Sequence, residues 1–204
     1  LTLLDLLEEQ EDTQHVYANF DIPDAILAAH AGTACLMRIL GIDPGLNVTG
    51  YGEIAVDGSR CSFMTAGDVR PPRGRPLPER LGALHRALAE LIERRPPDTI
   101  VLEMVYTHSR YVQTAALIAH ARGVVCLVAE EHGVPVAQYP PARVKQAVTG
   151  RGDASKDQVA RMVVQWLGAS DPAWSHDATD ALALAIAHAH MNASRQQLAI
   201  SPQR

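Results

Sequence analysis

The chain has 204 residues, which is enough for one well-filled hydrophobic core and too few for two ordinary ones. Apolar residues make up 47% of it, yet no run approaches the ~20 apolar residues that a membrane span requires. No basic segment precedes an apolar stretch as in a signal peptide, and the three cysteines lack the spacing of a zinc site or a disulfide framework. We therefore expect one main domain, located in the cytoplasm.

The formal net charge of -5 is distributed unevenly along the chain. Residues 1–36 hold seven acidic residues and no Lys or Arg, so the rest of the chain holds 18 basic and 16 acidic residues. The first methionine, Met37, directly precedes the first predicted strand. We expect residues 1–36 to be an acidic extension, either disordered or not part of the natural protein, with an acidic helix as the alternative. A domain over 37–192 and a polar tail over 193–204 would follow.

The first half of the domain reads as an antiparallel meander followed by a helix. Residues 38–43, 49–56 and 60–69 are predicted strands separated by short turns that contain glycine. The stretch RPPRGRPLPER cannot continue a strand because of its prolines, and it predicts a basic loop. A helix follows, with Leu and Ile at helical spacing on one face between residues 81 and 92.

The second half alternates strands with helices. We predict a buried strand over 99–105, a long Ala-rich helix over 109–131 and a strand over 134–139. Helices are predicted over 141–148 and 155–167, and a last one from 177 to about 191. A meander followed by alternating strands and helices indicates an α/β fold with a mixed sheet and helices on both faces.

Four carboxylates stand out from this pattern. Asp43 ends the first predicted strand, and Glu103 lies within the apolar run TIVLEMVY. Asp177 and Asp180 are three residues apart at the start of an almost wholly apolar helix, so they project from one face. Clustered carboxylates repel one another unless a cation lies between them, and oxygen ligands favour Mg²⁺ or Mn²⁺. Two such ions ~4 Å apart would support in-line hydrolysis of a phosphodiester.

Each carboxylate also has a simpler interpretation. Asp43 precedes Pro-Gly and could be a turn residue. Asp177 could be the N-cap of its helix, with Asp180 placed favourably near the helix dipole. Glu103 is the hardest to explain in this way, because a lone Glu in a buried strand requires a buried cation or an active site.

Five segments resemble the RuvC family of Holliday junction resolvases, which belongs to the ribonuclease H-like superfamily: GIDPGLNVTGYG, LEMVY, ARGVV, ARVKQAVTGRGDASKDQV and DATDALALAIAHAH. The resemblance covers about residues 38–191 and implies a ribonuclease H-like five-stranded mixed sheet. It further implies a bacterial, Mg²⁺-dependent homodimer that resolves four-way DNA junctions by symmetric paired nicks in recombination and repair. The RuvA and RuvB branch-migration proteins are the implied partners. By position, the implied catalytic acids are the same four carboxylates.

The resemblance also implies the DNA contacts. Lys145 and Lys156 are the only lysines of the chain and lie in the segment that matches the DNA-binding region of the family. Arg122 and Arg151 are candidates for further phosphate contacts, although an individual surface Arg is often simply solvated. Tyr106 stands where the family often has Phe and could stack on an unpaired base. His176 is either a group supporting the site or an exposed residue at a helix start.

Other functions stay open at this point. A nuclease of the same fold that acts on another nucleic acid, such as an RNA–DNA hybrid, would use the same carboxylates without needing a dimer. A catalytically silent junction-binding protein would be expected to lack at least one of the acids. A sugar-kinase or actin-like ATPase would repeat its fold twice, and the chain is too short for that.

Overall fold

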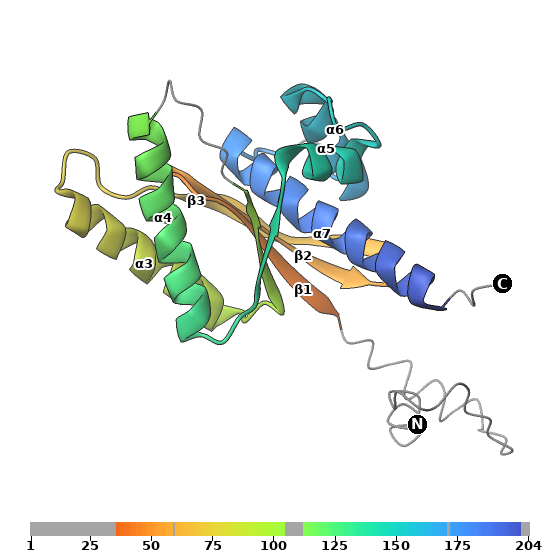
Figure 1. The fold of residues 1–204 in the computed structure, drawn as a ribbon, viewed down its shortest axis with the longest axis horizontal. Helices are drawn as coiled ribbons and strands as arrows, with labels where there is room; N and C mark the ends of the chain where they lie inside the picture. Colours follow the sequence, from red (N-terminus) through yellow and green to blue (C-terminus); the bar gives the residue numbers. More distant parts are fainter. Residues whose placement is uncertain (1–35, 59, 105–111, 171, 201–204) are drawn as a thin grey trace, which may run out of the picture. The chain divides into compact units, whose positions relative to one another are not determined.

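The computed structural model describes residues 36–58, 60–104, 112–170 and 172–200 (Figure 1). The elements in these ranges are β1 (Met37–Asp43), β2 (Thr49–Asp57), β3 (Arg60–Val69), α3 (Leu77–Arg94), β4 (Thr99–Glu103), α4 (Val112–Glu131), β5 (Val136–Tyr139), α5 (Pro141–Thr149), α6 (Lys156–Trp166) and α7 (His176–Ile200). The order of strands and helices is the one predicted from the sequence.

The five strands form one mixed sheet in the order β3-β2-β1-β4-β5. The β1–β2 and β2–β3 pairs are antiparallel, whereas the β1–β4 and β4–β5 pairs are parallel. The predicted meander and the predicted mixed sheet are therefore confirmed. Because β1 and β4 are parallel neighbours, their carboxyl ends meet at the same edge of the sheet.

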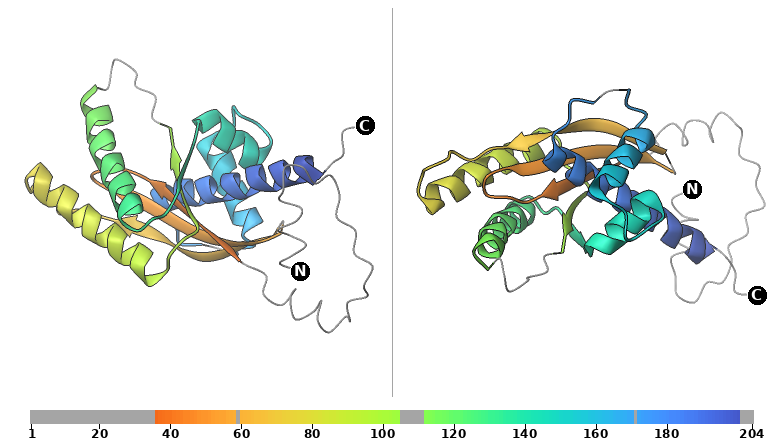
Figure 2. Two further views of the ribbon diagram at one scale, coloured as in Figure 1. Left: turned by 60° about the horizontal axis from the view of Figure 1, so that its bottom comes forward. Right: turned by 90° about the horizontal axis from the view of Figure 1, so that it is seen from above.

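Helices cover both faces of the sheet (Figures 1 and 2), and each face has its own core. Side chains of α3 and α4 pack with Leu40 and Ile42 of β1 on one face. Side chains of α5, α6 and α7 pack with Ile39 and with Val101 of β4 on the other face. The alternation of side chains along a strand thus places odd-numbered residues of β1 and β4 toward α7.

The boundaries differ from the predicted ones at several points. Strand β5 begins at Val136 rather than residue 134, since Pro135 has no N–H to donate to a ladder. Strand β4 ends at Glu103, and the expected start of the long helix at residue 109 lies outside the described residues. Helix α7 continues to Ile200, past the expected end near residue 191, because the intervening segment contains neither Gly nor Pro.

Two further features bear on the predictions. Helix α6 begins at Lys156, directly after the predicted start Ser155, which caps it: the Ser155 side chain accepts from the Gln158 N–H in a capping box. Across the described residues, no helix is both long and apolar enough to cross a membrane.

Candidate active site

Two of the four carboxylates lie at the ends of neighbouring parallel strands. Asp43 is the last residue of β1, and Glu103 is the last residue of β4. The register pairs Ile42 with Leu102, so the next positions along both strands are Asp43 and Glu103. Both residues have odd numbers and therefore share the face that carries Ile39 and Val101, the face covered by α7.

Helix α7 brings the other two carboxylates close because glycines let its backbone lie directly on β1 and β2. A Cβ atom at Gly41 would lie 1.9 Å from the Ala181 carbonyl oxygen, and one at Gly50 would lie 2.1 Å from that of Asp177. Gly52 is likewise too close to Leu182 for a side chain. At these three positions there is room only for the hydrogen atom of glycine and not for a side chain.

The electrostatics of Asp43 reflect this convergence. Its pKa is raised from 3.8 to about 6, mainly by burial and then by the charges of Asp180, Glu103 and Asp177, whereas the charge of Lys156 lowers it. The pKa of Glu103 is also raised, first by burial and then by Asp180. Raised carboxyl pKa values of this kind, from burial and from neighbouring carboxylates, are typical of functional sites.

A pocket between the strand ends and the helices joins these groups. It is lined by Asp43, Glu103 and Asp180, together with both lysines of the chain, Lys145 and Lys156. Asp177 does not line it, and it acts on Asp43 through its charge. The structure therefore brings three of the predicted carboxylates into one pocket and places the fourth beside it.

Lys156 supplies the positive charge nearest to these acids. Its Nζ donates to Asp180 Oδ2 at 2.8 Å, and this hydrogen bond raises the pKa of Lys156, which Asp43 and Glu103 raise further. The lysine side chain is 81% exposed, so its ammonium can leave Asp180 without moving the backbone. Lys145 contributes a positive charge as well, which lowers the pKa of Glu103.

Another buried carboxylate provides a contrast. Glu53 of β2 is 2% exposed, and its Oε1 accepts from the guanidinium of Arg38, while Arg95 Nη1 lies 4.0 Å from Oε2. It is thus neutralised by arginines, as a buried charge must be. The carboxylates of the pocket have fewer cations than acids around them.

The donor chemistry of the pocket fits a hard divalent cation. Carboxylate oxygens are the ligands that Mg²⁺ and Mn²⁺ prefer, and a cation would relieve the repulsion that raises the pKa of Asp43. In the described part of the chain, however, no three His, Cys, Asp or Glu side chains are already arranged around a metal position. The ammonium of Lys156 occupies the place beside Asp180 instead.

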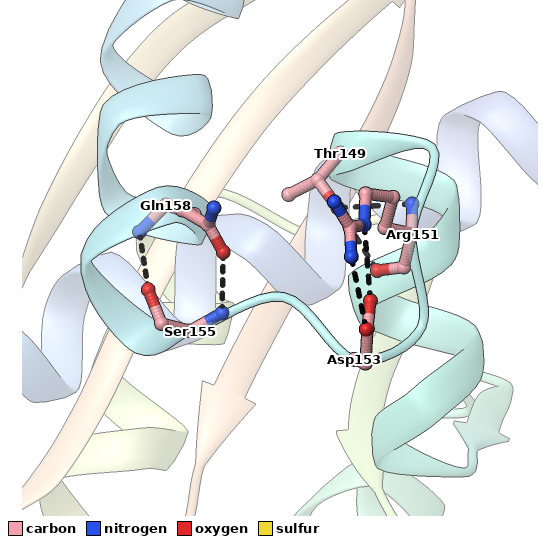
Figure 3. Close-up of polar contacts among 5 residues, drawn as sticks. All are labelled: Thr149, Arg151, Asp153, Ser155 and Gln158. Carbon is pink, nitrogen blue, oxygen red and sulfur yellow. Dashed lines mark hydrogen bonds and ion pairs between the residues drawn. The ribbon is translucent and has the colours of Figure 1, made fainter.

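The structure places the other predicted DNA-binding residues differently. Arg122 Nη1 donates to the backbone oxygen of Glu103 at 2.6 Å, so this side chain supports the end of β4. Arg151 forms a two-point ion pair with Asp153, with Nε to Oδ1 at 3.1 Å and Nη2 to Oδ2 at 3.0 Å (Figure 3). This arginine lowers the pKa of Asp153. Tyr106 lies outside the described residues.

The amino end of α7 corrects one interpretation. The helix begins at His176, and its capping residue is Ser175, whose hydroxyl accepts from the Ala178 N–H at 3.0 Å. The alternative interpretation of Asp177 as an N-cap is therefore wrong, since Asp177 lies inside the first turn. His176 is exposed and is not among the residues that line the pocket.

Sequence reasoning missed Ser175 and its partner Asp68 on β3, whose Oδ1 accepts from the Ser175 hydroxyl at 2.5 Å. A serine two residues before an acidic helix start is a local sign of a cap. Nothing local indicates the contact with Asp68, which lies 107 residues earlier in the chain.

Comparisons with known proteins agree with this architecture. The sequence profile of the family described as crossover junction endodeoxyribonuclease RuvC matches residues 39–188. The RuvC protein of Halorhodospira halophila is 48% identical over 156 residues, which span 76% of this chain and 91% of that protein. The structure of T. thermophilus RuvC in complex with Holliday junction substrate is 34% identical, with a TM-score of 0.73 over 78% of this chain and 96% of that one. The yeast mitochondrial Holliday junction resolvase Ydc2 shares the fold, with a TM-score of 0.59 at 14% identity over 88% of this chain and 90% of that one.

Proposed function

This chain belongs to the RuvC family of crossover junction endodeoxyribonucleases, and we propose that four carboxylates carry out its hydrolysis of DNA: Asp43, Glu103, Asp177 and Asp180. Membership makes the protein a Holliday junction resolvase by homology. The observation that supports the assignment of these residues is the meeting of Asp43 and Glu103 at adjacent strand ends, under a helix whose two acids raise the pKa of Asp43.

We further propose that these residues hold two divalent cations, Mg²⁺ or Mn²⁺. When bound, such ions supply the positive charge that activates a water molecule and stabilises the leaving oxygen of the cleaved phosphodiester. The role of the chain is to hold its carboxylates oriented toward one point, where bound cations would favour their ionised forms. Asp180 must then exchange its hydrogen bond with Lys156 for a cation, which frees the ammonium to bind a DNA phosphate.

The DNA contacts are proposed to surround this pocket. Lys145 and Lys156 line it and would bind the phosphates next to the cleaved bond. Arg122 would hold Glu103 in place through its hydrogen bond to the Glu103 backbone oxygen and would lie near the DNA backbone. Arg151 would contact a DNA phosphate once its guanidinium separates from Asp153. We retain Tyr106 as the residue that stacks on an unpaired base, a proposal that rests on the resemblance alone.

Symmetry supports a proposal about assembly. A four-way junction has two-fold symmetry, so paired nicks in opposed strands require two active sites related by a dyad, as in a homodimer. T. thermophilus RuvC has been determined in complex with Holliday junction substrate, and we propose the same substrate for this chain. RuvA and RuvB are the proposed partners in branch migration, and the cytoplasm is the proposed location because the chromosome is there in a bacterium.

The test is cleavage of a synthetic mobile four-way junction by the purified protein with Mg²⁺ or Mn²⁺, compared with linear duplex and an RNA–DNA hybrid. We expect paired symmetric nicks in the junction alone and none in the presence of a chelator. Glu103→Gln should abolish cleavage while junction binding survives. Glu130→Gln, which makes the same change on an exposed position of α4, is the matched control and should cut normally.

Two results would contradict the proposal. Preferential cleavage of the hybrid would identify a nuclease with another substrate. Junction binding without any cleavage, with either metal, would identify a catalytically silent binder.

A further inference from the structure

We propose that Asp68 and Ser175 form a positioning contact that fixes the amino end of α7, and with it Asp177 and Asp180, against the sheet. This inference rests on the proposed function, because it concerns how two of its four carboxylates are held. Neither residue lines the pocket, so neither touches the substrate, and both would act through the helix.

The contact uses the Ser175 hydroxyl in both directions. The hydroxyl donates to Asp68 Oδ1 at 2.5 Å and accepts from the Ala178 N–H at 3.0 Å. The Ser175 carbonyl oxygen accepts from the N–H and the hydroxyl of Thr179 at 3.0 and 2.8 Å. Ser175 is therefore bonded to the first turn of α7 at three points and to β3 at a fourth.

Asp68 is itself held in place. Its Oδ2 accepts from Arg70 Nη2 at 2.7 Å, which leaves Oδ1 for Ser175. The Asp68 side chain is only 14% exposed, compared with 57% for Arg70. A carboxylate accepting from a serine hydroxyl in a partly buried site forms a stronger bond than two neutral groups would.

The register of the sheet connects this contact to the active site. Asp68 of β3 pairs with Gly50 of β2, and Gly50 pairs with Asp43 of β1. These three residues form one row across the sheet on the face covered by α7. The Asp177 carbonyl lies over the middle of the row, where Gly50 leaves room for it. The amino end of α7 thus lies on Gly50 and is hydrogen-bonded to Asp68 at one end of the row. Asp43 lies at the opposite end of the row.

This geometry explains why a cap alone would not be sufficient. A serine cap can satisfy the Ala178 N–H with no partner on the sheet, and it then stabilises the helix without orienting it. The bond to Asp68 adds a fixed point on β3 and restricts rotation of the first turn, which carries Asp177 and leads directly into Asp180. Small displacements of groups in an active site have large effects on its chemistry.

The test uses paired variants with and without hydrogen-bonding capacity. Asp68→Ala and Ser175→Ala remove the contact, whereas Asp68→Asn keeps an acceptor oxygen and Ser175→Thr keeps a hydroxyl. Ile92→Val, in the core on the opposite face, is the control for loss of stability alone. The readouts are the melting temperature, Mn²⁺ binding by calorimetry in the absence of DNA, and hydrogen exchange of the first-turn amides of α7.

We expect Asp68→Ala to accelerate exchange at Ala178 and Thr179 about tenfold, because the first turn is no longer bonded to β3 and opens locally more often. Asp68→Ala and Ser175→Ala should each weaken Mn²⁺ binding, and the double variant should bind no more weakly than Ser175→Ala. Asp68→Asn, Ser175→Thr and Ile92→Val should bind Mn²⁺ like the wild type. Junction binding without metal should not change in any of them.

Two results would overturn the inference. One is wild-type exchange at the first turn in Asp68→Ala, and the other is unchanged Mn²⁺ binding in both alanine variants. The proposed function fails separately, if the wild type cuts no junction. In that case the exchange measurement still decides whether Asp68 fixes the end of α7.

Discussion

Asp43 combines burial with three like charges, and its ionised form is correspondingly costly in the metal-free protein. Its pKa is 3.8 in an unfolded chain and about 6 in the fold, because of burial and of the charges of Asp180, Glu103 and Asp177. Between these pH values the folded protein binds more protons than the unfolded one. The free energy of unfolding that depends on this group therefore falls as the pH rises from about 4 to about 6.

We accordingly predict that Asp43→Asn stabilises the metal-free protein at neutral pH while abolishing cleavage. The gain in the free energy of unfolding should be on the order of 2 kcal/mol at pH 7.5 and should vanish toward pH 4. Chemical denaturation of both proteins in a chelator, across this pH range, measures the difference. A difference that is the same at every pH would show that the charge of Asp43 is not its cause.

A second prediction at the residue scale concerns Asp153. Its carboxylate pairs with the guanidinium of Arg151, which we propose to contact DNA. Both side chains are exposed, at 73% for Asp153 and 71% for Arg151, so a phosphate can compete for the arginine. We predict that Asp153→Asn tightens junction binding about two- to fivefold and steepens its salt dependence by about one phosphate contact. Titration of a labelled junction at several salt concentrations measures both.

The control for that experiment is Asp57→Asn, which makes the same charge change at the exposed end of β2. It should leave the affinity almost unchanged. Combining Asp153→Asn with Arg151→Gln should remove the gain, and a gain that persists in the double variant would mean that Arg151 does not contact the DNA.

At the scale of elements, α7 is the part that determines the spacing of the site. Its backbone lies on Gly41, Gly50 and Gly52, so the distance between its acids and Asp43 is set by contact between main chains. Flexible side chains contribute little to that distance. The distance between α7 and the sheet is therefore fixed wherever the helix packs on these glycines.

Gly50→Ala tests this arrangement. The added Cβ would lie 2.1 Å from the Asp177 carbonyl oxygen, and we predict a loss of about 2 to 4 kcal/mol in the free energy of unfolding together with loss of cleavage. Gly123→Ala on α4 is the matched control, since nothing lies within 4 Å of its added Cβ and alanine favours a helix. An unfolding midpoint equal to that of the wild type for Gly50→Ala would contradict the packing described here.

At the same scale, the order of the elements could be predicted from the sequence, whereas some of their ends could not. The strands and helices followed from hydrophobic spacing and from Gly and Pro, as β1 and α6 show. The predicted end of α7 was wrong because no Gly or Pro marks it. The predicted start of β5 was wrong because the strand begins only after Pro135. The meeting of Asp43, Glu103 and Asp180 in one pocket could be anticipated, because a carboxylate in an apolar pattern is conspicuous. The Asp68–Ser175 contact could not, because it depends on the register of three strands.

Charge distribution is the property that belongs to the whole molecule. The first 36 residues carry seven acidic side chains and no Lys or Arg, whereas the remainder holds 18 Lys and Arg against 16 acidic residues. A DNA-binding surface gains affinity from positive potential and loses it to nearby negative charge. Removal of residues 1–36 is therefore predicted to leave junction cleavage intact or to increase it, most clearly at low salt.

Cleavage and binding assays of the shortened protein at low and moderate salt measure this effect, with the full chain beside it. Loss of dimerisation or of cutting on shortening would contradict the prediction and would give the acidic segment a positive role.

The docking of α7 over the row of Asp43, Gly50 and Asp68 also has a consequence during protein synthesis. Asp43 leaves the ribosome early, whereas Asp177 and Asp180 are among the last charged residues of the domain to be translated. A nascent chain that has formed only its antiparallel meander consequently has one of the four carboxylates, Asp43, and no helix over the glycines of β1 and β2. The four carboxylates can therefore come together only after α7 has been synthesised and has docked on the sheet.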